Sequence, residues 1–168
     1  MNLYIVRHGS AAPHGSPGVP DEERPLTEEG IQKMKQIAQG LRALEMIPDV
    51  ILSSPLVRAR QTAEILLRAF EADEKKLRLI QALAPSGSRP QLHQEIHAYR
   101  KLQSVMLVGH QPSLGEIAGE IAWGSADHCL ELKKGGVCAL AIEELLPTPR
   151  GTLFCLLTPA ILRAFSPR

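Results

Sequence analysis

Hydrophobic residues gather in short runs that alternate with longer segments of mixed polarity along the chain. Three runs, at residues 3–6, 50–52 and 105–108, are continuously apolar, as is typical of strands buried on both faces of a sheet. Two further runs, 137–142 and 153–157, are separated by a short segment rich in proline and could pair as a hairpin. The pattern therefore predicts five strands.

The segments between these runs carry a helical period. Thr27 is the expected N-cap of a first helix that ends near residue 45, and its apolar face recurs at spacings of three and four: Ile31, Met34, Ile37, Leu41 and Leu44. Ser54 and Pro55 predict the cap and first position of a second helix. Further helices are expected over 90–101 and 112–122, whereas residues 10–26 are rich in Gly, Pro and Ser and predict a long loop.

Strands that alternate with helices predict an α/β fold. We expect a mostly parallel sheet with helices on both faces, joined at its C-terminal end by the antiparallel hairpin. The chain has 168 residues, which is close to the size of one typical domain, so a single domain is expected over residues 1–168.

The amino-acid composition argues against some classes of binding partner. There are 19 basic and 18 acidic residues and few aromatic side chains, which argues against a nucleic-acid partner. No apolar run approaches the roughly 18 residues that span a bilayer, and the N-terminus lacks a basic signal-peptide region, so no membrane partner is expected. The cysteines Cys129, Cys138 and Cys155 show no Cys-x-x-Cys spacing. Two of them lie in the apolar runs 137–142 and 153–157 and are expected to be buried, inert thiols. These features predict a cytoplasmic protein.

Four residues with phosphate chemistry occupy equivalent places in this pattern. Arg7 and His8 follow the first apolar run, and His110 follows the third. Arg58 lies in the expected first turn of the helix after the second run. Because ligands of open parallel sheets bind outside the carboxyl ends of the strands, we expect these side chains to meet there.

Two arginines and two histidines suit a phosphoryl group. Guanidinium groups bind phosphate through paired N–H donors. A neutral histidine can attack phosphorus through one ring nitrogen while the other donates its proton to a backbone carbonyl. Preorganised donors can stabilise the charge that builds on the transferred group, so neither a metal ion nor another cofactor is required.

Competing interpretations of other residues are weaker. His93 and His97 share a helix face as zinc ligands would, but the metalloprotease pattern needs Glu where Gln94 stands, and exposed helix histidines are expected instead. His14 and His128 are expected to be solvated. Arg60 shares a helix with Arg58 and is expected at the surface. No cysteine begins a Cys-x5-Arg phosphatase motif.

The segments that carry these residues resemble the histidine phosphatase superfamily, which includes the phosphoglycerate mutases. Four stretches match in order and approximate spacing along the first 115 residues: 3–9 (LYIVRHG), 24–30 (RPLTEEG), 54–63 (SPLVRARQTA) and 108–110 (VGH). The short chain, and the segment Leu-Ala-Pro-Ser-Gly at 83–87 where larger members carry an acidic segment, are similar to the SixA-type phosphohistidine phosphatases.

The resemblance implies that His8 is the phosphorylated nucleophile and that Arg7, Arg58 and His110 complete the phosphate pocket. Arg24 is either a further phosphate contact or part of a loop salt bridge. Many members of the superfamily protonate the leaving group with a Glu or Asp, and no residue of this sequence matches that acid. Three loop carboxylates could reach the pocket: Asp21, Glu22 and Glu23.

Three functions follow as hypotheses. The leading one is a metal-independent phosphatase that hydrolyses phosphohistidine in a partner protein, for example a phosphotransfer domain, through phospho-His8. The lack of a general acid should slow hydrolysis of a phosphoramidate less than hydrolysis of an alkyl phosphate, because the leaving nitrogen of the phosphoramidate is easier to protonate. The alternatives are a phosphatase for small phosphoesters and a phosphate-binding interaction module without turnover.

Overall fold

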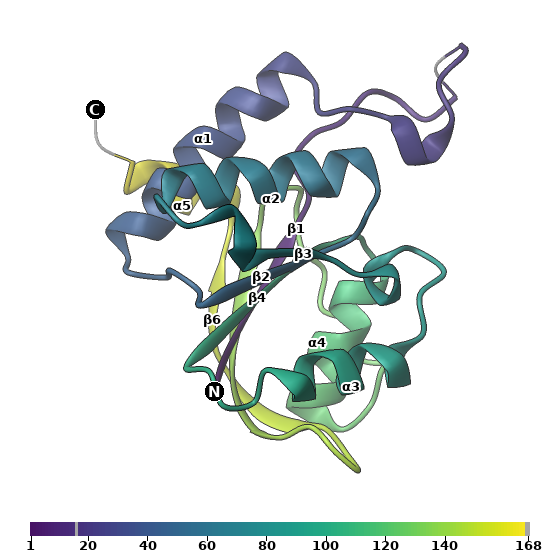
Figure 1. Cartoon of the computed structure of the whole chain (residues 1–168), viewed down its shortest axis with the longest axis vertical. Helices are drawn as coiled ribbons and strands as arrows, with labels where there is room; N and C mark the ends of the chain where they lie inside the picture. Colours follow the sequence, from purple (N-terminus) through teal and green to yellow (C-terminus); the bar gives the residue numbers. More distant parts are fainter. Residues whose placement is uncertain (16, 167–168) are drawn as a thin grey trace.

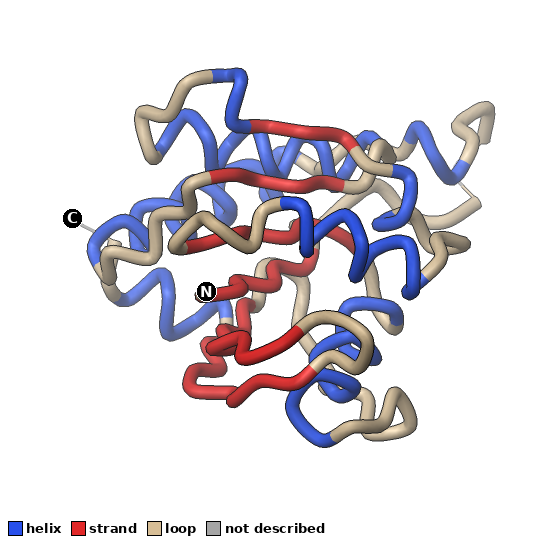
Figure 2. Tube along the Cα trace, turned by 60° about the horizontal axis from the view of Figure 1, so that its bottom comes forward, coloured by secondary structure: helices blue, strands red, loops and turns tan. Residues whose placement is uncertain are grey.

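A six-stranded mixed sheet forms the centre of the computed structural model, which describes residues 1–15 and 17–166 (Figures 1 and 2). The strand order is β3-β2-β4-β1-β5-β6. The strands are β1 (Asn2–Arg7), β2 (Val50–Ser53), β3 (Leu77–Leu79), β4 (Ser104–Gly109), β5 (Val137–Glu144) and β6 (Arg150–Leu157).

Parallel pairing dominates the sheet, as the sequence predicts. β3, β2, β4 and β1 pair in parallel, and β5 then joins β1 and β6 in antiparallel pairs. The predicted hairpin is therefore confirmed. All six residues of β4 are buried, because this strand lies inside the sheet with helices over both faces, which explains its continuous apolar run.

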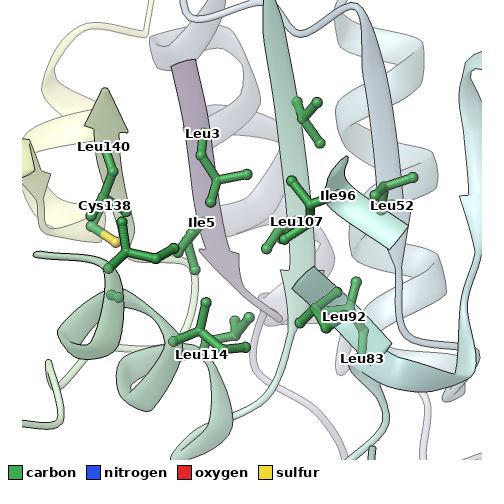
Figure 3. Close-up of a cluster of buried hydrophobic side chains, with 14 of the residues drawn as sticks. Leu3, Ile5, Leu52, Leu83, Leu92, Ile96, Leu107, Leu114, Cys138 and Leu140 are labelled. Carbon is green, nitrogen blue, oxygen red and sulfur yellow. The ribbon is translucent and has the colours of Figure 1, made fainter. Parts of the chain in front are cut away.

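Helices cover both faces of the sheet (Figure 1). On one face, α1 (Glu28–Ala43), α2 (Val57–Ala69) and α5 (Pro159–Ala164) enclose one apolar core. On the other face, α3 (Arg89–Ala98) and α4 (Ser113–Trp123) pack on a second core, which includes Leu3, Ile5 and Leu107 (Figure 3). In the described residues no helix is both long and apolar enough to cross a membrane.

The structure confirms the predicted N-cap of one helix and contradicts that of another. The Thr27 hydroxyl accepts a hydrogen bond from the Gly30 N–H at 3.0 Å, so the predicted cap of α1 is confirmed. The prediction for α2 was wrong: Leu56 holds an extended conformation as N-cap, and the helix begins at Val57. Arg58 still falls in the first turn. Ser54 lies before the helix, where its hydroxyl is free to contact another strand end.

One short strand and one short α-helix were not predicted, and neither were three 3-10 turns, Asp21–Glu23, Glu74–Lys76 and Gln81–Leu83. β3 is a three-residue edge strand with the sequence Leu-Arg-Leu, too short to show a strand pattern. α5 follows Thr158, whose hydroxyl accepts from the Ile161 N–H at 3.4 Å, and it packs on α1. Residues 10–26 form a loop as expected, with one 3-10 turn at Asp21–Glu23, and Ser16 lies outside the described residues.

Strand register brings the three predicted chemical positions to one edge of the sheet. Arg7 at the end of β1 lies opposite Gly109 at the end of β4. Ser53 at the end of β2 lies opposite Val108 of β4. The residues that follow these three strand ends therefore emerge side by side, above the C-terminal edge of the parallel strands.

Candidate active site

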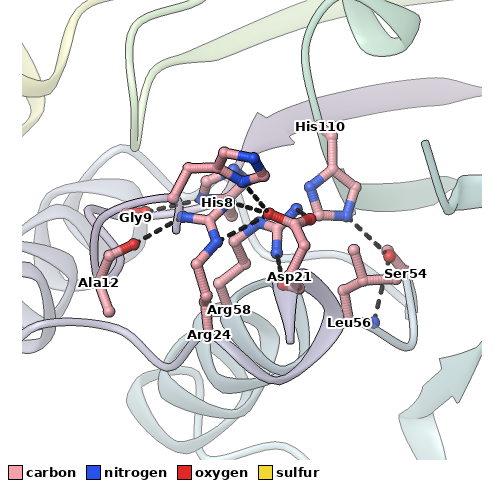
Figure 4. A network of polar contacts seen from close by, with 10 residues as sticks. His8, Gly9, Ala12, Asp21, Arg24, Ser54, Leu56, Arg58 and His110 are labelled. Carbon is pink, nitrogen blue, oxygen red and sulfur yellow. Dashed lines mark hydrogen bonds and ion pairs between the residues drawn. The ribbon is translucent and has the colours of Figure 1, made fainter. Parts of the chain in front are cut away.

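A pocket of about 340 Å³ lies at this edge and is lined by every residue that the sequence proposed for the phosphate site. Figure 4 shows His8, Arg58 and His110 converging from three separate elements. The lining residues are Arg7, His8, Ala11, Asp21, Arg24, Arg58, Pro85, His110, Gln111 and Lys134.

His8 is buried at the end of β1 with its ring orientation fixed by the backbone. Its Nδ1 lies 2.7 Å from the carbonyl oxygen of Gly9, which can only accept, so Nδ1 carries the proton and donates. The pKa of His8 is lowered to about 4, first by burial and then by the cations Arg58 and Arg7, against the opposing effect of the Gly9 carbonyl. At neutral pH the ring is neutral, and Nε2 keeps the lone pair that a nucleophile needs.

Gly9 packs the end of β1 against two helices. A Cβ at this position would lie 2.6 Å from Met34 Cγ of α1, so a larger residue would push the strand end away. The Gly9 N–H donates to Thr62 Oγ1 at 3.1 Å, and the Thr62 hydroxyl donates to the Arg58 carbonyl at 2.7 Å. Thr62, which no sequence pattern singled out, thus ties the backbone next to His8 to α2.

Arg7 is held by a segment distant in sequence. Its Nη1 donates to the Leu132 carbonyl at 2.7 Å, and its backbone N–H donates to the Gly136 carbonyl at 3.1 Å. The Gly135 N–H returns a hydrogen bond to the Arg7 carbonyl at 3.0 Å. The same turn carries Lys134, whose positive charge further lowers the pKa of His8. Nothing in the local sequence of this turn indicates a place in the pocket.

His110 follows β4 and faces His8, with 5.1 Å between the ring centroids. Its Nε2 lies 2.8 Å from Ser54 Oγ, and that oxygen accepts a hydrogen bond from the Leu56 N–H at 3.3 Å, which leaves the Ser54 hydroxyl proton available to Nε2. Burial lowers the pKa of His110 to about 3, and the positive charge of Arg58 adds to the effect. Ser54 is therefore a second site residue that the sequence analysis missed, because it was assigned to a helix cap.

Arg58 and Arg24 both contact the loop residue Asp21 (Figure 4). Arg58 donates from Nη1 to the Asp21 carbonyl at 2.6 Å and from Nη2 to Asp21 Oδ2 at 3.1 Å. Arg24 donates from Nε to Asp21 Oδ1 at 2.8 Å and from Nη1 to the Ala12 carbonyl at 2.6 Å. Arg24 thus forms the expected loop salt bridge and also lines the pocket, and its contact with phosphate stays a prediction.

Asp21 is the one acidic residue among those that line the pocket. His14 lies 3.0 Å from its Oδ1 and Arg24 2.7 Å from the same oxygen, whereas Glu22 and Glu23 on the same turn are exposed to solvent. The hydrogen bonds from His14 and Arg24 and the charge of Arg58 hold the pKa of Asp21 far below its usual range. The carboxylate is therefore ionised throughout the physiological range.

Three buried nitrogens of the pocket residues have no hydrogen-bond partner among the residues that the structure describes: Arg7 Nε, Arg58 Nε and His110 Nδ1. A buried polar atom without a partner costs on the order of 1–3 kcal/mol, so such atoms are uncommon unless they have a ligand to bind. Two of them are guanidinium donors. Together with the positive charge of Lys134 they make the pocket suited to a phosphoryl oxyanion.

The other histidines and cysteines do not form a second site of this kind. The expected exposure of His93 was wrong: it is buried where α3 packs on α4, with Nε2 3.1 Å from Glu120 Oε2. The described residues contain no cluster of three His, Cys, Asp or Glu side chains that could hold a metal ion. Cys138 is buried, which raises the pKa of its thiol to about 12, but Cys129 is exposed. Arg60 is exposed, as expected.

A larger hollow of about 520 Å³ lies over α2 and β3. Its lining combines the exposed Arg60 with Glu64, Arg68, Glu74 and apolar side chains, and contains no histidine or cysteine. Size therefore does not identify the site in this molecule. The convergence of buried nitrogens makes the smaller pocket the candidate site.

The chain is similar in sequence and in fold to known proteins. The family described as "Histidine phosphatase superfamily (branch 1)" matches residues 3–84. The chain is 42% identical over 142 residues to an uncharacterised protein of Picosynechococcus sp., covering 83% of this chain and 84% of that protein. It is 31% identical over 129 residues to a phosphohistidine phosphatase SixA homolog of Haemophilus influenzae, covering 72% and 77%. A solved structure of the protein histidine phosphatase SixA with tungstate shares the fold, with a TM-score of 0.83 at 23% identity, covering 95% of this chain and 98% of that one.

Proposed function

This chain belongs to the histidine phosphatase superfamily and is SixA-like, and from this premise we propose that it hydrolyses phosphohistidine in proteins through a phosphoryl group carried on His8. The single observation that carries the proposal is the neutral His8 ring, held with its Nδ1 proton on the Gly9 carbonyl, inside a pocket of buried guanidinium donors. This arrangement supplies both the nucleophile and the stabilisation of charge that phosphoryl transfer needs.

The first step forms the bond between His8 Nε2 and phosphorus and breaks the bond between phosphorus and the substrate imidazole. The electron pair of the broken bond stays on the imidazole nitrogen, while the distal ring nitrogen, protonated from solvent, makes that ring a neutral leaving group. Arg7, Arg58 and His110 bind the phosphoryl oxygens. In the second step water attacks phospho-His8, inorganic phosphate leaves, and His8 returns to its neutral form as the proton of the water passes to solvent.

The absence of a general acid from the pocket lining supports a phosphoramidate substrate. Asp21 is ionised and bound to two arginines, so it is a poor proton donor. Pro85, from the segment where larger relatives carry acidic residues, contributes no carboxyl group. An alkoxide leaves slowly without a proton, and general acid catalysis is usually worth about a hundredfold to ten-thousandfold. A phosphorylated imidazole takes its proton before the bond breaks.

The test compares specificity constants of one preparation on a phosphohistidine phosphotransfer protein and on phosphoserine peptides. We expect kcat/KM to be at least about a hundredfold larger on the phosphohistidine protein. His8→Ala serves as the control for contaminating phosphatases. Equal constants, or a higher constant on a small phosphoester in a panel of such compounds, would replace the proposal with the alternative of a small-molecule phosphatase.

Covalent labelling separates an enzyme from a phosphate-binding module. The wild-type chain mixed with a reactive phosphodonor should give an acid-labile phosphoryl label in a burst equal to the enzyme concentration. Binding of phosphate without label or turnover would favour the module. A phosphotransfer protein as the partner and the cytoplasm as the location stay predictions.

A further inference from the structure

We propose that Asp21 is a positioning residue that holds the Arg58 guanidinium with its Nε–H side toward the transferred phosphoryl group. The inference rests on the proposed function, because it assigns the place of one donor in that reaction. Its basis is the two-point contact between Asp21 and Arg58, in which the carboxylate and the backbone carbonyl of one residue engage both terminal nitrogens (Figure 4).

The contact leaves part of the guanidinium available. An arginine has five N–H donors, and Asp21 accepts one from Nη1 and one from Nη2. The Nε–H remains, together with one hydrogen on each terminal nitrogen. Nε is fully buried and has no partner among the described residues. A phosphoryl oxygen that binds one of these remaining donors leaves the contact with Asp21 in place. Positioning by Asp21 therefore differs from competition, in which the Asp21 carboxylate would occupy the place of the ligand.

The burial of Arg58 explains how the contact with Asp21 can assist the reaction. Arg58 is 4% exposed, so its side chain is enclosed by the fold, whereas a free arginine side chain would sample many rotamers. A guanidinium placed in advance contributes more to transition-state stabilisation than one that must reorganise during the reaction. Fixing both terminal nitrogens determines the rotation of the planar group about its long axis.

Asp21 is itself fixed from the opposite side. Arg24 contacts Asp21 Oδ1 with Nε at 2.8 Å and Nη2 at 2.7 Å, and reaches the Ala12 carbonyl with Nη1. His14 contacts the same carboxylate oxygen at 3.0 Å. The loop thus presents one carboxylate, bound by Arg24 and His14 on one oxygen and by Arg58 on the other. In this arrangement Arg24 supports the pocket by holding Asp21.

The ionised state of the carboxylate fits a positioning role. The groups that face Asp21 are His14, Arg24 and Arg58, and all three favour its charged form. A general acid must be protonated at the start of the reaction, and Asp21 is not. Removal of the carboxylate should therefore weaken phosphoryl binding and transfer without removing a pH-dependent step from the activity profile.

The experiment measures inhibition by orthovanadate, a phosphoryl mimic, together with the rate of covalent labelling, in the full-length chain. Asp21→Ala should raise the vanadate inhibition constant and slow labelling by about tenfold to a hundredfold, because a donor displaced by about 1 Å costs up to that much. Asp21→Asn keeps one carbonyl acceptor and should recover part of the loss. Glu22→Ala, an exposed carboxylate on the same turn, is the matched control and should behave as wild type.

A double-mutant cycle with Arg58→Lys shows whether the effect passes through Arg58. A lysine at position 58 has one terminal nitrogen and cannot make the two-point contact. Adding Asp21→Ala to Arg58→Lys should therefore change the vanadate inhibition constant and the labelling rate by less than about twofold. The proposal would be overturned if Asp21→Ala weakened vanadate binding and labelling equally in wild type and in Arg58→Lys. It would also be overturned if Asp21→Ala bound vanadate more tightly than wild type, because Asp21 would then compete with the ligand. Thermal unfolding of each variant detects loss of structure. Vanadate binding tests Asp21 even if the wild type fails to hydrolyse phosphohistidine, so the two proposals can fail separately.

Discussion

The two sides of the pocket are built by different means. On one side Arg7, His8, Ser54 and His110 follow strand ends, and backbone register places them: the His8 N–H donates to the Gly109 carbonyl at 3.0 Å and the Ser54 N–H to the Val108 carbonyl at 2.9 Å. On the other side the loop 10–26 is held against the pocket by side-chain ion pairs of Asp21, whose side chain is 38% exposed.

The difference separates residues that take part directly in the reaction from residues that adjust its rate. Groups on buried strand ends share the stability of the sheet and keep a precise geometry, which a reacting centre requires. The loop is joined to the pocket through one partly exposed carboxylate, so it shares less of that stability and opens more easily. We therefore expect loss of His8 on the strand-end side to remove activity. Changes to the supporting residues, Ser54 on that side and Asp21 on the loop side, should lower activity without removing it.

The largest effect is expected for His8→Ala. The substitution removes the attacking nitrogen at the end of β1, so turnover and the covalent label should both disappear while the circular dichroism spectrum stays native. Both are measured with a radiolabelled phosphodonor. An equal label on the variant would show that another residue is phosphorylated, and the strand-end side would lose its assigned role.

Arg58 and Arg60 give the next largest contrast within one helix. Arg58 is buried in the pocket, whereas Arg60 is exposed and its Nε lies 3.7 Å from Glu64 Oε1. Arg58→Ala should lower kcat/KM by about a hundredfold or more, because it removes a donor to the developing charge. Arg60→Ala should stay within about twofold of wild type, in line with the small effect of an exposed ion pair. Similar losses in both would contradict the placement of the pocket at the start of α2.

Ser54→Ala should reduce activity by a smaller factor, about tenfold. The hydroxyl fixes His110 through a 2.8 Å contact, and loss of one such buried hydrogen bond costs on the order of 1–3 kcal/mol. Steady-state kinetics on the same substrate measures the effect. Ser54→Thr keeps a hydroxyl and should recover most of the activity; no recovery would mean that the change acts by disturbing the start of α2.

The buried histidines also predict how stability depends on pH. The unfolded chain takes up protons at His8 and His110 near pH 6.5, whereas the folded pKa values are about 4 and about 3. Since the unfolded state then binds more protons, the free energy of unfolding should fall as the pH is lowered from 6.5 towards 4. Urea unfolding of wild type and His8→Asn at pH 7 and 4.5 tests this expectation, and the variant should show the shallower slope. Parallel slopes would contradict a buried neutral His8.

The smallest effect is expected from chelation. Arg7 and Arg58 supply positive charge at the pocket, and the described residues offer no metal-binding cluster of His, Cys, Asp or Glu. Turnover should be unchanged within error after dialysis against EDTA. A loss that one divalent ion restores would show that charge stabilisation depends on a metal ion.

Much of this architecture could be predicted because it depends on local periodicity. The apolar runs at 3–6, 50–52 and 105–108 became the buried strands β1, β2 and β4, since a strand buried on both faces must be apolar at every position. Strand ends of a parallel sheet meet at one edge, so Arg7, His8 and His110 could be placed together without coordinates. The three-residue strand β3 escaped notice because so short a segment carries no period.

The sequence by itself determined which chemical residues lie at or just after the ends of the buried strands, and that Arg7, His8 and His110 gather there with Arg58 from the next helix. Only the tertiary structure decided the partners of those residues. Three of these contacts join residues that lie far apart in the chain. Ser54 and His110 are 56 positions apart, Arg7 and Leu132 are 125 apart, and Asp21 and Arg58 are 37 apart. These contacts depend on how loops and strand ends pack in three dimensions, and no spacing along the chain encodes them.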